Sequence, residues 1–309
     1  MIPELVLDGF AVTAKIDYVQ VFCEVRLGDL PGLAERCNWT RNLPNEGWLL
    51  TVHDASRRDI DVIVRELQDP PMTALEVAVD FKLGPGLADV LRQASLATMF
   101  SALAARFRPE DNALFGAGFK GGFSGRGKPS PFHRRLPRPS ESLVYGHRGE
   151  GQNAKLYFKQ QDAGVDLAPS EWSVRLEVTM YGPALFEYGV REVSGLYGFG
   201  FRKKLAKSFR IVDRAAVRYR KQRSDESAAE LSSLLSKAWS RAGVNALFPP
   251  TLPPDASKFA RDAVAGRKHQ LLPIKEYRLV RHAAAHLLIG NALRQLDRRM
   301  ASRISGGSD

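Results

Sequence analysis

Three short strand-like segments place charged groups and one phenol at alternate positions. They cover residues 75–81, 155–159 and 174–178 and read LEVAVDF, KLYFK and VRLEV. Because alternate residues of a strand share a face, each segment gathers its polar side chains on one side. These side chains are Glu76 and Asp80, then Lys155, Tyr157 and Lys159, then Arg175 and Glu177. If the three strands are neighbours and these faces coincide, the facing side chains lie within about 5 Å of one another.

Such a set predicts cleavage of a phosphodiester bond. A site made only of carboxylates prefers Mg²⁺ or Mn²⁺ to zinc. A free phenol has a pKa of about 10 and is a poor nucleophile at neutral pH, so we expect Lys155 and Lys159 to favour the phenolate of Tyr157. Arg175 and Arg148 could each hold a neighbouring phosphate through paired hydrogen bonds. The sequence therefore predicts an enzyme that nicks DNA through a covalent phosphotyrosine.

The overall charge also favours a polyanionic partner. The chain has 309 residues and a formal net charge of +11, and such a surplus indicates nucleic acid or an acidic membrane face. No apolar run approaches the roughly 20 residues of a membrane-spanning helix, and the first residues lack the pattern of a signal peptide. Cys23 and Cys37 form neither a disulfide framework nor a metal-ligand spacing. We therefore expect a cytoplasmic protein that binds DNA and no membrane.

Two segments rich in basic residues are candidates for contact with DNA. Residues 112–140 hold six Lys/Arg, six glycines and no acid, a composition that suits single-stranded nucleic acid, with a surface loop that touches nothing as the alternative. Residues 202–223 hold ten Lys/Arg against one acid, which is typical of a surface that follows phosphates, with a solvated face as the alternative. Together with Arg148, the predicted DNA contacts are Lys120, Arg126, Lys128, Arg134, Arg135, Arg202, Lys203, Lys204, Lys207, Arg210, Arg218 and Arg220.

The order of strand and helix patterns predicts an α+β fold. Strands are expected at 16–25, 48–52, 74–81, 142–145, 154–159 and 172–180, and helices at 30–37, 54–68, 87–107, 224–242, 256–265 and 275–302. Strands thus gather before residue 200 and helices after it. We expect an antiparallel-sheet catalytic domain with flanking helices over 1–199. A basic, mostly helical DNA-binding region over 200–309 is expected to follow.

The order and spacing of these motifs resemble the Rep-trans replication initiation factors, the rolling-circle initiators of small plasmids with relatives in phages and conjugative elements. That family has an acidic strand, a turn with Gly-x-Arg, a Tyr-x-Lys strand and Arg-x-Glu after a tryptophan. The corresponding residues here are 75–81, 146–148, 155–159 and Trp172 with 175–177. The resemblance covers roughly residues 45–180.

The resemblance implies that Tyr157 is the nucleophile and that Glu76, Asp80 and Glu177 bind the metal. It also implies sequence-specific nicking and closing at an origin, a homodimer, and a host helicase as partner. Three departures keep the required chemical groups: Glu76 stands where Asp is usual, Glu150 where serine is common, and Lys155 where arginine is usual.

Several other interpretations remain open. A conjugative relaxase would use the same chemistry, a regulator would bind DNA without cutting it, and a hydrolytic nuclease would use water while Tyr157 only packs. His282 and His286 share a helical face, but Ala283 stands where a metalloprotease has glutamate, so a structural or DNA-facing pair is expected. The sequence contains no His-x-His pair, so the common two-histidine nickase site is absent.

Overall fold

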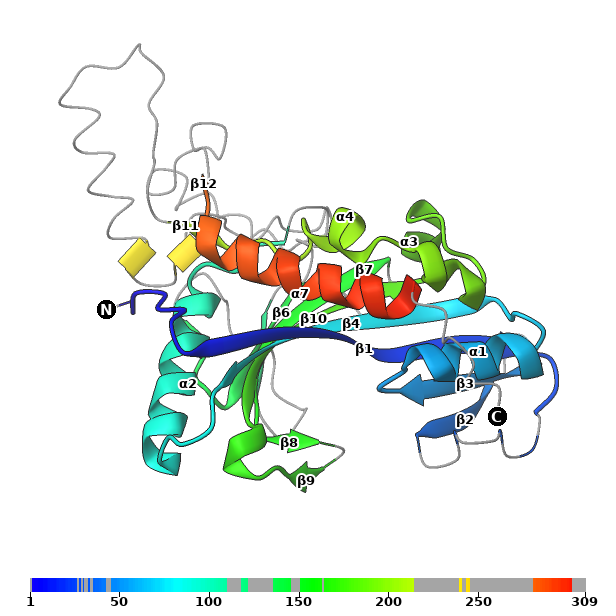
Figure 1. Cartoon of the computed structure of the whole chain (residues 1–309), viewed down its shortest axis with the longest axis horizontal. Helices are drawn as coiled ribbons and strands as arrows, with labels where there is room; N and C mark the ends of the chain where they lie inside the picture. Colours follow the sequence, from blue (N-terminus) through cyan, green and yellow to red (C-terminus); the bar gives the residue numbers. More distant parts are fainter. Residues whose placement is uncertain are drawn as a thin grey trace, which may run out of the picture.

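Two central strands, β4 (Met72–Leu83) and β10 (Ser173–Tyr181), are buried along nearly their whole length. They occupy the middle of an antiparallel eight-stranded sheet with the order β2-β3-β1-β4-β10-β7-β6-β5 (Figure 1). The other strands of this sheet are β1 (Phe10–Cys23), β2 (Cys37–Asn42), β3 (Gly47–His53), β5 (Gly118–Gly121), β6 (Glu141–Tyr145) and β7 (Gln152–Lys159). The computed structural model describes residues 2–26, 28, 30, 33, 36–42, 46–109, 118–121, 136–145, 151–162, 164–213, 239–240, 243–244 and 280–301.

The two faces of β4 differ in chemistry although both are buried. Leu75, Val77 and Val79 are fully buried on the apolar face. Glu76 and Asp80, on the other face, are only 5% and 3% exposed. Because a buried carboxylate is unfavourable unless it is paired and hydrogen-bonded, the polar face must supply partners for these two side chains.

Helices pack around the sheet. They are α1 (Arg57–Glu66), α2 (Asp89–Ala104), α3 (Gly182–Glu187), α4 (Phe201–Leu205) and α7 (Ala283–Ala301), with short 3-10 helices η2 (Pro169–Glu171) and η3 (Val193–Gly198). Helix α1 begins with a capping box, in which Ser56 and Asp59 bond to each other's backbone N–H. This box satisfies two donors that the first helical turn leaves without partners.

The C-terminal helix α7 packs on β1 and on α4 (Figure 1). Its buried side chains, among them Ile289, Leu293 and Leu296, belong to the same hydrophobic core as Ile16 of β1. His282 lies just before the helix and its Nδ1 accepts a hydrogen bond from the backbone N–H of Ala285 at 3.2 Å. This capping contact gives His282 a structural role at the start of α7.

The predicted α+β class is confirmed. The expected strands at 48–52, 74–81, 142–145, 154–159 and 172–180 all form, as do the expected helices near 54–68 and 87–107. Strand β1 begins six residues before its expected start at 16, and helix α7 begins at 283 rather than 275. Short elements without a strong periodic pattern escaped prediction: β2, α3, the hairpin β8 (Gln161–Asp162) with β9 (Val165–Asp166), and the pair β11 (Val212–Asp213) with β12 (Val280–Arg281).

Some expected elements lie in parts of the chain that the structure does not describe. The helices expected at 224–242 and 256–265, and most of the glycine-rich segment 112–140, lie outside the described residues apart from a few positions. The division into regions 1–199 and 200–309 stays a prediction. No helix in the described part of the chain is long and apolar enough to cross a membrane.

Candidate metal and nucleophile site

The polar faces of β4, β10 and β7 coincide, which meets the condition that the alternation of their residues left open. Strand β10 lies between the other two, so each of its residues faces one on either side. Arg175 faces Asp80 and Tyr157. The pairs continue in regular register, so the polar side chains form successive rows across three strands. The next two rows along the strands are Lys155–Glu177–Ala78 and Asn153–Thr179–Glu76.

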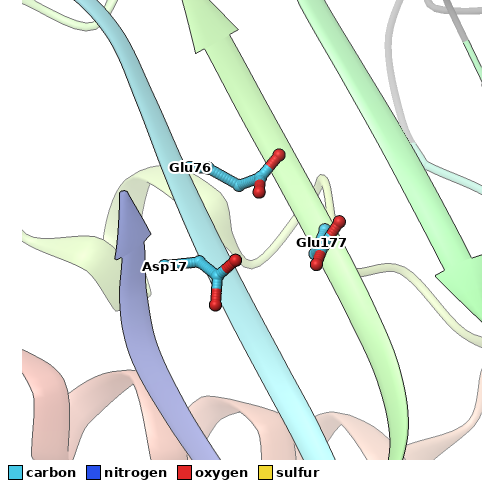
Figure 2. Close-up of side chains that lie close together, drawn as sticks. All are labelled: Asp17, Glu76 and Glu177. Atoms are coloured by element: carbon cyan, nitrogen blue, oxygen red, sulfur yellow. The ribbon is translucent and has the colours of Figure 1, made fainter. Parts of the chain in front are cut away.

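Three carboxylates converge on this face. Asp17 of β1, Glu76 of β4 and Glu177 of β10 each offer an oxygen, and these oxygens lie within 4.8 Å of one another (Figure 2). Glu76 and Glu177 are 5% and 3% exposed, while the side chain of Asp17 is 19% exposed. Such a buried, all-oxygen donor set matches the ligands that Mg²⁺ and Mn²⁺ prefer.

Asp17 reaches the cluster because β1 is irregular at that point. Ile16 faces Val77 and Tyr18 faces Glu76, so Asp17 is an extra residue in the ladder. A bulge of this kind redirects side chains and is common beside active sites. Sequence reasoning missed Asp17, because its strand pattern showed no sign of the pairing with β4. The available signal was an acidic residue, Asp17, near the start of the strand expected at 16–25.

Asp80 lies outside this cluster, although it was predicted as a ligand. Its two oxygens accept hydrogen bonds from Nε and Nη2 of Arg175 at 2.7 and 2.8 Å, and Ser173 Oγ adds a third at 3.0 Å. Arg175 also donates to Asp17 Oδ1 at 2.7 Å. Arg175 is only 3% exposed, and its hydrogen bonds hold Asp80 and Asp17 in place. The predicted contact of Arg175 with a phosphate stays a prediction that this burial disfavours.

The hydroxyl of Tyr157 is turned toward the acid cluster and donates a short hydrogen bond to Glu177 Oε1. Burial raises the pKa of Tyr157 well above its ordinary value, and the negative charge of Glu177 raises it further. The expectation that lysines on the same face favour the phenolate is therefore wrong for this arrangement. Lys155 bonds to the glutamates and Lys159 pairs with Asp162 at 3.0 Å, so neither lysine is engaged with the phenol.

The ammonium group of Lys155 lies against two of the three carboxylates. Lys155 Nζ lies 3.2 Å from Glu177 Oε2 and 3.5 Å from Glu76 Oε2. Burial acts to lower the pKa of Lys155, but the charges of Glu177 and Glu76 outweigh it and raise the pKa. This side chain is thus a stand-in cation at the carboxylates. Its position shows that the cluster accommodates positive charge, and the donor set fits a divalent ion.

The pKa values of the carboxylates also indicate a site that favours a cation. Burial raises the pKa of Glu76 to about 7, and the neighbouring charge of Glu177 adds to the rise. For Asp17, burial acts in the same direction, but Arg175 and Lys15 outweigh it and lower the pKa. Acids held this close repel one another, so a cation among them would relieve the repulsion.

The predicted DNA contacts are placed only in part. Arg202, Lys203 and Lys207 are exposed on or just after α4, Lys204 donates to the carbonyl oxygen of Tyr188, and Arg210 is half-buried. Lys120 belongs to β5, whose side chains are not described. Arg126, Lys128, Arg134, Arg135, Arg148, Arg218 and Arg220 lie outside the described residues.

Comparison of the chain with protein-family models, curated proteins and solved structures finds no significant match. The resemblance to the Rep-trans initiators therefore rests on the motifs alone and stays a prediction.

Proposed function

We infer that the chain cuts and rejoins single-stranded DNA through a covalent bond between Tyr157 and a 5′ phosphate, as a rolling-circle replication initiator does. The observation that carries this proposal is the hydrogen bond from the Tyr157 hydroxyl to Glu177, a member of the Asp17, Glu76 and Glu177 cluster. A nucleophile, a carboxylate that can take its proton and a cation site thus lie together.

The reaction follows from these groups. Glu177 can accept the phenolic proton as the Tyr157 oxygen attacks phosphorus, so a raised phenol pKa is no obstacle when the proton leaves during attack. The Tyr157 Oη–P bond forms, the P–O3′ bond breaks, and the released 3′ oxygen gains a proton. Attack by a later 3′ hydroxyl on the phosphotyrosine reverses these steps and closes the strand.

Asp17, Glu76 and Glu177 would hold the Mg²⁺ or Mn²⁺. A bound ion supplies charge neutralisation at the scissile phosphate. The side chain of Lys155 is one-third exposed, so its ammonium can turn toward the phosphate when another cation takes its place. Arg175 keeps Asp17 oriented through its 2.7 Å hydrogen bond.

The basic residues support DNA as the substrate. The net charge of +11 and the exposed Arg202, Lys203 and Lys207 favour a polyanion. Origin recognition, a homodimer and a host helicase follow from the motif resemblance and belong to the same proposal. A conjugative relaxase would share every feature of the site and differ only in its biological context.

A covalent trapping experiment tests the proposal. The protein is incubated with Mn²⁺ and a pool of random-sequence single-stranded oligonucleotides, and products that survive SDS are mapped by mass spectrometry. DNA is expected on Tyr157, and Tyr157→Phe should remove it from that position while DNA binding persists. Tyr188→Phe, which removes a phenol hydroxyl bonded to Gln152, should leave the adduct intact. Cleavage without an adduct would indicate a hydrolytic nuclease, and binding without cleavage would indicate a regulator; either result overturns the proposal.

A further inference from the structure

Two aromatic rings stand beside the acid cluster, on the side away from Tyr157. Tyr18 of β1 is paired with Glu76 of β4 on one side and with His53 of β3 on the other. Directly paired residues share a face of the sheet, and their Cβ atoms lie about 5 Å apart. Since the strand order is β3-β1-β4-β10-β7, the carboxylates lie between these two rings and the strand that carries Tyr157.

The rings of Tyr18 and His53 meet at an angle. Their centroids lie 6.0 Å apart and their planes make an angle of 63°. His53 is exposed and Tyr18 is half-buried, so the pair lies at the surface of the sheet. Two rings at such an angle form a corner, in which a third flat ring can stack on one and contact the edge of the other. Nucleotide bases are flat rings of this kind and stack on aromatic side chains whatever their sequence.

The surroundings of the two rings suit a base better than a phosphate. The pairs that continue this face along β1 and β3 are uncharged: Gln20 with Thr51, then Phe22 with Leu49. Gln20 Nε2 donates a hydrogen bond to Thr51 Oγ1 at 3.0 Å. The charged side chains beside this stripe, Lys15 and Asp54, form an ion pair with each other. A phosphate needs cations to neutralise it, whereas a base is held by stacking and by hydrogen bonds to polar groups.

The position of Tyr157 gives the direction in which the cut strand leaves. Its phenol reaches Glu177 from β7, the side of the cluster opposite to β1. In phosphoryl transfer the attacking and leaving oxygens lie roughly in line across the phosphorus. The three carboxylates come from β1, β4 and β10, which lie side by side in that order (Figure 2). For a phosphate at these carboxylates, the leaving 3′ oxygen therefore faces β1, and its nucleoside faces Tyr18 and His53.

We propose that Tyr18 and His53 bind the base of the nucleotide whose 3′ oxygen leaves the phosphorus. This inference rests on the proposed function of Tyr157. After the cut, one strand is covalently attached to Tyr157, but the strand that ends in the 3′ hydroxyl has no covalent bond to the protein. Closing requires this hydroxyl to attack the phosphotyrosine, so the strand must stay in place. A base held between the two rings keeps the 3′ end beside the carboxylates until it reacts.

Photocrosslinking tests which strand the rings hold. The probe is a pool of random-sequence single-stranded oligonucleotides in which 5-iodouracil replaces thymine, because this base crosslinks to an adjacent aromatic side chain under ultraviolet light. Full-length protein is incubated with the pool and Mn²⁺, irradiated, digested and mapped by mass spectrometry. Crosslinks are expected on Tyr18 or His53. The crosslinked strand should end in a 3′ hydroxyl, while a separate strand is attached to Tyr157 of the same chain.

Substitutions test what the rings contribute. Loss of one stacking contact should make the leaving strand dissociate about tenfold more readily. Tyr18→Leu and His53→Leu should therefore raise the ratio of trapped adduct to rejoined DNA by about that factor, whereas Tyr18→Phe keeps the ring and should behave as wild type. Phe186→Leu is the matched control, because it removes a ring of α3 that is 59% exposed and lies outside this row. Melting temperatures show whether each variant folds, and the exposed His53 carries the test if Tyr18→Leu does not.

The possible failures can be told apart. If DNA is found on Tyr157 but the crosslinks avoid Tyr18 and His53, the inference is overturned and the proposed function stands. The same holds if the crosslinked strand is the one attached to Tyr157, or if His53→Leu gives the same ratio as Phe186→Leu. If no DNA is found on Tyr157, the proposed function itself is wrong and the inference falls with it.

Discussion

Replacing Lys155 with methionine tests whether its ammonium occupies the cation position. Nζ lies 3.2 and 3.5 Å from two buried carboxylates, and at an effective dielectric constant of about 20 each contact is worth about 5 kcal/mol before desolvation. Most of this attraction is offset by burial, but removal of one partner from a buried pair usually costs about 3 kcal/mol. We therefore expect Lys155→Met to lower the unfolding free energy of metal-free protein by about 3 kcal/mol at pH 8.

The same substitution should strengthen metal binding, because a divalent ion no longer competes with the ammonium. If Mn²⁺ binding recovers half of the lost unfolding free energy of about 3 kcal/mol, the Mn²⁺ affinity rises about tenfold, since 1.4 kcal/mol corresponds to a factor of ten. Urea unfolding with and without Mn²⁺, together with calorimetric titration, measures both effects. Lys203→Met is the matched control, because Lys203 is an exposed lysine of α4 that does not belong to the acid cluster. Equal Mn²⁺ affinity in wild type and Lys155→Met would refute the reasoning.

Three further predictions concern stability. Because the pKa of Glu76 is about 7 in the folded protein against an ordinary 4.5, the folded state retains a proton that the unfolded chain has released. The unfolding free energy of metal-free protein should therefore fall by about 3 kcal/mol as the pH rises from 4.5 through 7. Urea unfolding across that pH range measures this change. Arg175→Lys should lower stability by about 3 kcal/mol, because lysine cannot keep both contacts to Asp80. Asp59→Ala should lower it by about 2 kcal/mol, since Asp59 closes the capping box of α1 and holds Arg36 with two 2.8 Å hydrogen bonds; thermal melting measures both variants.

Each of these predictions has an internal control. The Glu76→Gln variant has no carboxyl group to titrate at this position, so its unfolding free energy should change less between pH 4.5 and 7. If the change is as large as in wild type, another group causes the pH dependence. Arg65→Lys and Glu66→Ala alter a solvent-exposed ion pair and should shift stability by less than about 1 kcal/mol. If Arg175→Lys is as mild as Arg65→Lys, the buried guanidinium does not organise the carboxylates. A similar result for Asp59→Ala and Glu66→Ala would mean that the capping box contributes little.

Local patterns predicted much of the sheet and most of the site. The alternation at 75–81, 155–159 and 174–178 correctly placed Glu76, Tyr157 and Glu177 on one face, because a period of two is a property of the strand itself. The helix expected over 54–68 forms as α1, whose start is set by residues close together in the sequence, the capping pair Ser56 and Asp59. Short elements such as β2 carry too few residues for a periodic pattern, so their positions depended on the strands beside them.

The sequence by itself determined which side chains share a face, that the chain is basic, and that the fold is α+β with an antiparallel sheet. Only the tertiary structure decided that Asp17 joins Glu76 and Glu177, that Asp80 is held by Arg175, and that burial raises the pKa of the phenol. The physical reason is that alternation operates within one strand. Ion pairing, bulges and desolvation depend instead on which strands become neighbours and in what register they meet.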